Sequence, residues 1–141
     1  MERLGQTLHS HLKQRGKPFT LKTVCQVGIR LIELFEMLHS TGKVYNDLKL
    51  DNILVGDKDG SASSLCDIRL IDFGLCTGYL NSKGQHIKEV NKTPFSGNMI
   101  LGSVNGMNFK SVSRRDDLIS LTYLMVYMLT GSLRFLKYRH L

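Results

Sequence analysis

A carboxylate, an ammonium group and an amide lie within one short stretch of this chain, at Asp47, Lys49 and Asn52, and a second carboxylate, Asp72, ends the next apolar run. Phosphoryl transfer needs a carboxylate to accept the proton of the attacking hydroxyl, a cation near the phosphate and oxygen ligands for magnesium. Asp47 fits the first role, Lys49 the second, and Asn52 with Asp72 the third. Each residue taken singly is more typical of a turn, so the ordered set carries the prediction.

Helices are predicted on both sides of this set. A short helical pattern that includes Leu8 ends at Gly16. Residues 21–40 repeat apolar side chains with helical period, and Thr20 is a suitable N-cap. Residues 116–130 are apolar on nearly every side and too few to span a bilayer, which predicts a buried helix.

Two short strands are predicted to position the amide and the second carboxylate. Residues 53–55 follow Asn52 directly, and residues 68–71 end at Asp72, so pairing them would bring both polar residues to neighbouring strand ends. Residues 77–113 are rich in Gly, Asn, Ser and Lys without periodicity, which is typical of a functional or disordered loop. These elements predict a mainly α fold with short β hairpins (α+β).

Two motifs resemble those of protein kinases. Residues 45–52 resemble the catalytic loop H-R-D-x-K-x-x-N, and residues 72–74, Asp-Phe-Gly, resemble the magnesium-binding turn. Further matches extend over essentially residues 1–135 and resemble the casein kinase 1 group of serine/threonine kinases. They are Met1–Gly5, Leu38-His39-Ser40, Leu75 after the turn, His86-Ile87, Asn91-Lys92, Ser103-Val104-Asn105, Arg114–Leu118, Ser120-Leu121 and Gly131-Ser132-Leu133.

The resemblance implies a partial kinase domain over 1–141, the large lobe only and truncated at both ends, that uses ATP and Mg²⁺ to phosphorylate protein Ser/Thr. Its implied parts are a hinge (1–5), the catalytic loop (45–52), the magnesium turn (72–74), an activation segment (75–113) and the buried helix (116–130). The implied roles are catalytic base for Asp47, phosphate contact for Lys49, magnesium ligands for Asn52 and Asp72, adenine or nucleotide-pocket contacts for Leu4, Leu54 and Ile71, and anchor of the catalytic loop for Asp117.

Several positions depart from the family pattern. Asn46 replaces the arginine that can pair with a phosphorylated activation loop, Ile100 replaces an arginine that helps bind primed substrates, and Arg134 replaces a proline. The 141 residues contain no Gly-x-Gly-x-x-Gly loop, and no ATP-pairing lysine is identified. We therefore expect little or no activity from this chain alone. A non-catalytic binding or scaffold protein is the alternative function, and an incomplete product that folds poorly is a third.

Composition agrees with one globular domain. The chain is 42% hydrophobic and has no apolar run that would predict a membrane span. Cys25, Cys66 and Cys76 lack metal-ligand spacing, which favours free thiols in a reducing compartment, the cytoplasm or alternatively the nucleus. The net charge of +7 comes from scattered Lys and Arg, so we expect a protein substrate, acidic by preference, rather than nucleic acid or membrane. The substrate's identity and the oligomeric state stay open.

Overall fold

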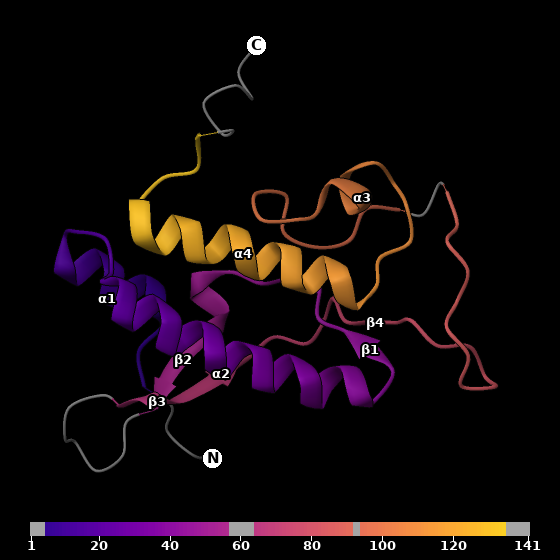
Figure 1. Cartoon of the computed structure of the whole chain (residues 1–141), viewed down its shortest axis with the longest axis horizontal. Coiled ribbons are helices and arrows are strands. Elements are labelled where there is room, and N and C mark those ends of the chain that lie inside the picture. The colour runs from indigo at the N-terminus through magenta and orange to yellow at the C-terminus, as the bar shows by residue number, and fades with distance from the viewer. Residues whose placement is uncertain (1–4, 57–63, 92–93, 135–141) are drawn as a thin grey trace.

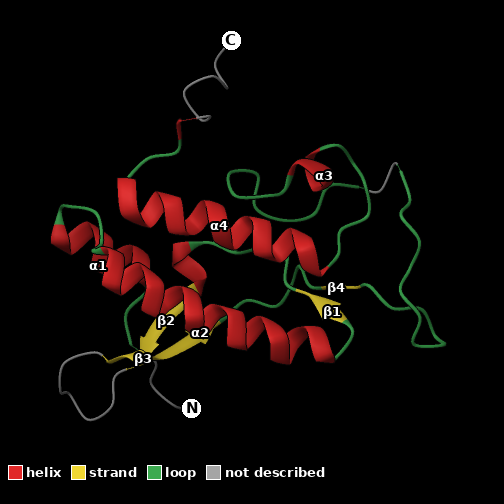
Figure 2. Cartoon of the chain, in the orientation of Figure 1, coloured by secondary structure: helices red, strands yellow, loops and turns green. Residues whose placement is uncertain are grey.

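The computed structural model describes residues 5–56, 64–91 and 94–134. Helices dominate, and two small antiparallel strand pairs accompany them (Figures 1 and 2). In chain order the elements are α1 (Leu8–Arg15), α2 (Leu21–Ser40), β1 (Lys43–Val44), the 3₁₀ helix η1 (Leu50–Asn52), β2 (Ile53–Gly56), β3 (Ser64–Leu70), β4 (Thr77–Gly78), α3 (Val104–Met107) and α4 (Arg114–Thr130). The predicted mixture of helices and short strands is therefore what the structure contains.

The two long helices form the centre of the molecule. α2 and α4 lie side by side in Figure 1, and α2 also contacts β1 and β3. Gly28 on α2 allows a close approach, because a Cβ atom there would lie 3.1 Å from the Met125 side chain of α4. The core that they share is built from apolar side chains of both helices and of the strands, among them Val24, Val27, Leu31, Phe35, Ile53, Val55, Leu121, Leu124 and Met128.

The predicted helix boundaries agree well with the structure. Thr20 caps α2, its hydroxyl accepting a hydrogen bond from the backbone N–H of Thr23 at 3.3 Å. α1 ends at Gly16, which adopts the left-handed conformation that favours glycine. α4 begins at Arg114, two residues before the predicted start, because the Asp116 carboxylate accepts the N–H of Ser113 at 2.7 Å and so fixes the first turn.

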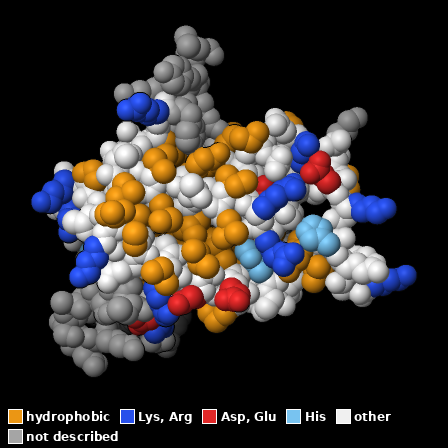
Figure 3. Space-filling view, viewed as in Figure 1, with side chains coloured by type: hydrophobic (Ala, Val, Ile, Leu, Met, Phe, Trp, Pro, Cys, Tyr) orange, Lys and Arg blue, Asp and Glu red, His pale blue; other side chains and the backbone are white. Residues whose placement is uncertain are grey.

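The prediction that the helix over 116–130 is buried on all sides is wrong. Leu118, Val126 and Leu129 are 45%, 42% and 37% exposed, whereas Leu121 and Leu124 on the opposite side are buried. The outer face of α4 continues onto α2, where Ile29 and further apolar side chains are also exposed, and Figure 3 shows these side chains gathered across both helices. The described residues thus cover one face of α4 only.

The strand pair β2–β3 is longer than predicted. β3 begins at Ser64, four residues before the predicted start, because Ser64 still pairs with Gly56 after a register shift between Val55 and Gly56. The register pairs Ile53 with Leu70. The second pair, β1–β4, joins the end of α2 to the segment after Asp-Phe-Gly.

The segment predicted as a loop over 77–113 contains short regular elements. β4 opens it and α3 lies near its end, with Ser103 capping α3 by accepting the N–H of Gly106 at 3.1 Å. An isolated bridge between Asn91 and Lys110 closes its middle part. No helix in the described part of the chain is long and apolar enough to cross a membrane.

Candidate functional site

Three of the predicted site residues meet in the loop between β1 and β2. The Asp47 side chain is buried, and its Oδ2 accepts hydrogen bonds from Lys49 Nζ at 2.6 Å and from Asn52 Nδ2 at 2.9 Å. Asn52 Nδ2 also donates to the backbone carbonyl of Asp47 at 3.0 Å. Because the amide of Asn52 uses its nitrogen in these bonds, its oxygen remains the atom suited to bind a cation.

The strand pair determines where the second carboxylate lies. The N–H of Ile71 donates to the carbonyl of Asn52 at 3.1 Å, so the chain enters Asp72 directly beside the end of the catalytic loop. Asp72 is exposed and has a φ of 59°, a left-handed conformation in which Asp is among the tolerated residues. Its Oδ1 accepts the N–H of Gly74 at 3.4 Å. The exposed carboxylate is thus available to a ligand.

Electrostatic interactions connect Lys49 with the carboxylates around it. The hydrogen bond to Asp47 holds the pKa of the Lys49 ammonium above its usual value, and the charges of Asp47, Asp72 and Asp51 act in the same direction. Lys49 therefore stays protonated at neutral pH and lies within electrostatic reach of both proposed site carboxylates.

The donor set suits magnesium better than a metal ion that is ligated by protein side chains alone. Within the described ranges, no three His, Cys, Asp or Glu side chains gather closely enough to hold a metal ion. Magnesium commonly takes only one or two protein carboxylates and completes its shell with water and phosphate oxygens. One carboxylate from Asp72 and one amide oxygen from Asn52 fit that requirement.

The residues predicted to contact the nucleotide are placed in part. Leu4 lies outside the described residues. Leu54 is buried on β2 and pairs with Arg69, which is two residues from Ile71, so Leu54 and Ile71 share one face of the strand pair. The segment before α1 is held against this hairpin, because the N–H of Val55 donates to the carbonyl of Gln6 at 2.9 Å.

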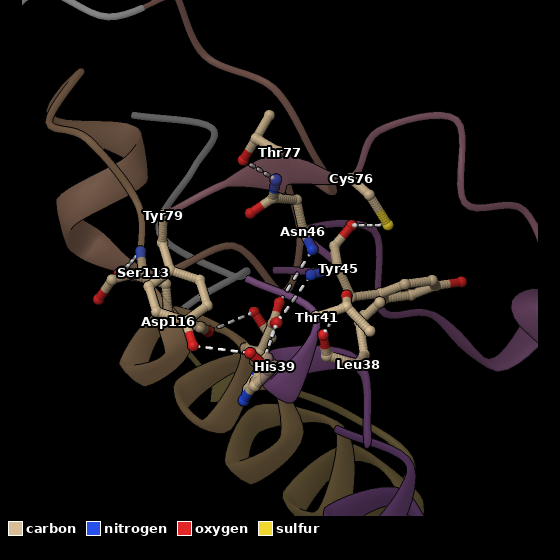
Figure 4. Close-up of polar contacts among 12 residues, drawn as sticks. Leu38, His39, Thr41, Tyr45, Asn46, Cys76, Thr77, Tyr79, Ser113 and Asp116 are labelled. Atoms are coloured by element: carbon tan, nitrogen blue, oxygen red, sulfur yellow. Dashed lines mark hydrogen bonds and ion pairs between the residues drawn. The ribbon is translucent and has the colours of Figure 1, made fainter. Parts of the chain in front are cut away.

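Asp117 on α4 contacts the backbone of the catalytic loop directly. The carboxylate is only 1% exposed and accepts the N–H of Tyr45 at 2.8 Å and that of Asn46 at 2.9 Å. His39 Nε2, at the end of α2, lies 2.8 Å from the same carboxylate. Figure 4 shows His39, Tyr45 and Asn46 gathered at this point. Asp117 therefore joins α2, α4 and the loop that carries Asp47.

Tyr45 links the catalytic loop to the Asp-Phe-Gly turn. Its hydroxyl donates to the carbonyl of Ile71, and its ring meets that of Phe73 edge to face, with centroids 5.6 Å apart. Burial raises the pKa of the phenol well above its ordinary value. The residue preceding Asp72 and the one following it therefore both contact the same tyrosine.

Asn46, noted in the sequence only as a missing arginine, joins both ends of the segment 75–98. Its Nδ2 donates to the carbonyl of Leu75 and to the hydroxyl of Thr77, each at 2.9 Å, and the latter bond is visible in Figure 4. Its carbonyl accepts the N–H of Asn98 at 3.4 Å. Gly97 must be a glycine there, because its φ is 135° and a Cβ would lie 2.6 Å from the Asn46 carbonyl oxygen. Asn46 has a φ of 68°, which Asn tolerates, and no pattern in the sequence predicted this conformation or the contacts that it allows.

A second network of polar contacts, between the segment 75–113 and α4, was not predicted from the sequence. The Ser103 hydroxyl, which caps α3, donates to the Asp116 carboxylate, and this carboxylate also holds the first turn of α4. The Glu89 carboxylate bonds Lys110 Nζ at 3.0 Å and an Arg115 nitrogen at 3.1 Å, which lowers the pKa of Glu89. Through Glu89 and Ser103, these contacts connect the segment 75–113 to α4.

Known proteins are similar in sequence to this chain over most of its length. A family model described as the protein kinase domain matches residues 1–140. A casein kinase I homolog of Saccharomyces cerevisiae is 37% identical over 131 residues, which are 92% of this chain and 24% of that protein. A casein kinase I homolog of Kluyveromyces lactis is 36% identical over 92% of this chain and 24% of its own length.

A probable casein kinase I homolog of Encephalitozoon cuniculi is 32% identical over 134 residues, 95% of this chain and 40% of that protein. The chain thus spans less than half the length of these relatives. The family resemblance seen in the motifs is confirmed, and the chain belongs to the protein kinase family as a casein kinase 1-like member.

Proposed function

We propose that this chain carries the phosphotransfer site of a serine/threonine protein kinase of the casein kinase 1 type. The observation that supports this most is the contact of Asp47 with both Lys49 and Asn52, beside the strand end that leads into Asp72. Protein kinases generally use ATP with Mg²⁺ and act on protein substrates. The described residues would form the large-lobe part of the fold.

The proposed roles follow from the chemistry of each group. Asp47 accepts the proton of the substrate hydroxyl, and Lys49 neutralises charge on the transferring phosphate. Asn52 and Asp72 hold magnesium through an amide oxygen and a carboxylate oxygen. Magnesium bound there supplies charge neutralisation at the phosphates of ATP.

Nucleotide binding is the first test. Thermal unfolding of the chain with ATP, with Mg²⁺ and with both should show stabilisation that needs the two together, since a ligand that binds only the folded state raises its stability. Asp72→Asn should abolish the magnesium-dependent part, whereas Glu36→Gln, which changes an exposed carboxylate of α2, should keep it. Stabilisation that survives Asp72→Asn would contradict the assignment.

Phosphotransfer is the second test. For the chain alone we expect no incorporation of phosphate into an acidic protein substrate, because no Gly-rich loop occurs in its 141 residues and no ATP-pairing lysine is identified. If incorporation does occur, Asp47→Asn should lower it by about 10²-fold or more, as loss of a general base does. Activity that Asp47→Asn leaves intact would refute the role proposed for Asp47.

A non-catalytic binding function is the alternative, and the Asn46 contacts favour it. Asn46 holds Leu75, Thr77 and Asn98 through its uncharged amide and its backbone carbonyl, so the positions of these residues do not depend on an arginine that pairs with a phosphorylated residue. Cooperative unfolding with no response to Mg²⁺ and ATP would support this alternative, and a magnesium-dependent response to ATP would exclude it in favour of the kinase site.

A further inference from the structure

A cavity of about 320 Å³ lies next to the proposed phosphotransfer site. Lys49 lines this cavity and also donates a hydrogen bond to Asp47, so its side chain borders both the cavity and the proposed site. The other walls come from α1, from residues 98–101 and from α4. This volume is at the lower end of the range for ligand pockets, about 300–1,000 Å³, which suits one or two amino-acid side chains rather than a large molecule.

Most of the cavity wall is apolar. Leu50, Leu101 and Leu124 are at most 5% exposed and belong to the core. Ile100 borders the same cavity and is half exposed. An apolar side chain that enters would therefore gain contact with apolar surface that is partly accessible to water now.

The charges around the cavity are unsuited to an anion. Lys49 is paired with Asp47 at 2.6 Å, and His9 lies 3.9 Å from the exposed carboxylate of Asp51. A phosphate or an acidic side chain would meet the negative charge of Asp51, while Lys49 is already used by another carboxylate. An apolar side chain encounters neither cost.

The wall formed by residues 98–101 is held in place before any ligand binds. Asn98 Oδ1 accepts the N–H of Ile100 at 2.7 Å and of Leu101 at 3.2 Å, and Asn98 Nδ2 donates to the carbonyl of Leu48 at 3.2 Å. The catalytic loop and this wall are thus joined by one side chain. A preformed cavity loses less entropy on binding.

We propose that this cavity binds an apolar side chain of the protein substrate, a few residues from the Ser or Thr that accepts phosphate. The proposal rests on the proposed kinase function and specifies its substrate. It is compatible with a general attraction of acidic proteins to the +7 chain, because long-range charge acts on encounter and this cavity on one side chain.

Peptide binding tests the proposal without any turnover. Three labelled peptides share a central serine and differ at one flanking position, which carries leucine, alanine or aspartate and is moved stepwise along the peptide. Binding to the 141-residue chain is measured by fluorescence anisotropy without nucleotide. We expect one position at which leucine binds about tenfold more tightly than alanine, with aspartate weakest. Equal affinities at every position, or a preference for aspartate, would overturn the proposal.

The place of binding is tested with ¹³C-methyl NMR and a matched pair of variants. The leucine peptide should shift the methyl signals of Ile100, Leu101 and Leu124 and leave that of Ile29 on the outer face of α2 unchanged. Ile100→Arg should lower the affinity for this peptide to that of the alanine peptide. Met99→Arg is the control, since Met99 is adjacent and 66% exposed. An equal effect of both variants, or shifts confined to other methyl groups, would refute the assignment.

Results that refute the cavity can be distinguished from results that refute the proposed kinase site. Loss of the leucine preference with intact magnesium-dependent ATP binding refutes the cavity only. Leucine-selective binding at Ile100 without any response to Mg²⁺ and ATP refutes the phosphotransfer site, and with it the role of the bound peptide as a substrate, but leaves the preference of the cavity for an apolar side chain intact.

Discussion

Replacing Asp117 with asparagine tests whether α4 holds the catalytic loop in place. The carboxylate is 1% exposed. It accepts hydrogen bonds from the backbone N–H groups of Tyr45 and Asn46 and makes a third hydrogen bond with the ring of His39. An asparagine of the same shape has one acceptor oxygen, so at least one of these donors would face an N–H₂ group. At least one and at most two of the three bonds are lost, depending on which way the amide is oriented.

The expected cost follows from that count. A hydrogen bond to a charged group contributes about 1.5–3 kcal/mol, and a buried donor left without a partner costs a similar amount. Asp117→Asn should therefore lower the free energy of unfolding by about 2–5 kcal/mol, a large part of the about 5–15 kcal/mol typical of a domain. Urea unfolding followed by circular dichroism at 25 °C measures this value.

A matched variant and a local readout complete the test. Glu33→Gln removes an exposed carboxylate that pairs with Arg30 on α2, and such pairs contribute about 0–1 kcal/mol. Hydrogen exchange should also accelerate at the amides of Tyr45 and Asn46 in the Asp117 variant. If Asp117→Asn costs no more than Glu33→Gln, or the two amides stay as protected as before, the anchoring argument is refuted.

Three further predictions concern neighbouring residues. Folding raises the pKa of the Tyr45 phenol, so this group stabilises the fold below the ordinary phenol pKa of about 10, and the stabilisation declines as the pH rises above that value. Urea unfolding between about pH 9 and 11 should therefore show a steeper fall in the free energy of unfolding for the natural chain than for Tyr45→Phe. Identical slopes would contradict this prediction. Asn46→Ala removes the two side-chain bonds to Leu75 and Thr77, about 1 kcal/mol in all, and should speed hydrogen exchange at residues 75–77 by about tenfold. The amide of Asn98 should change less, because it bonds to the backbone carbonyl that alanine keeps. Unchanged exchange at residues 75–77 would count against this prediction. Burial raises the pKa of the half-buried Cys76 thiol, so iodoacetamide at neutral pH should label the exposed Cys25 faster than Cys76. Mass spectrometry that finds Cys76 modified before Cys25 would reject this, with Cys25→Ser as the control.

The sequence predicted the site in part because its signals are local. Asp47, Lys49 and Asn52 lie in one short loop, and the apolar run before Asp72 predicts a strand that ends there. The pairing of β2 with β3 then places Asn52 beside the entry to Asp72. Helix periods and caps, such as Thr20 before α2, were equally readable because they depend on neighbouring residues.

The contacts that were missed join residues far apart in the chain. Asn46 donates to the carbonyl of Leu75 and to the hydroxyl of Thr77, and no local pattern relates an asparagine to acceptors so distant in the chain. The burial of α4 was misjudged for a similar reason, since the apolar residues of a helix show that it can be buried, but only the packing of other elements decides which sides are covered. The cavity beside Lys49 is likewise formed by four separate segments.

The amino-acid sequence by itself determined the family of this protein, its longer helices, the strand pair beside Asn52 and the residue types available for phosphoryl transfer, because these depend on motifs and on short-range periodicity. Only the tertiary structure decided which groups the Asp117 carboxylate binds, that Asn46 joins both ends of the segment 75–98, and that an apolar cavity opens next to Lys49. The physical reason is that hydrogen bonds and cavities form between surfaces, and folding alone brings these surfaces together.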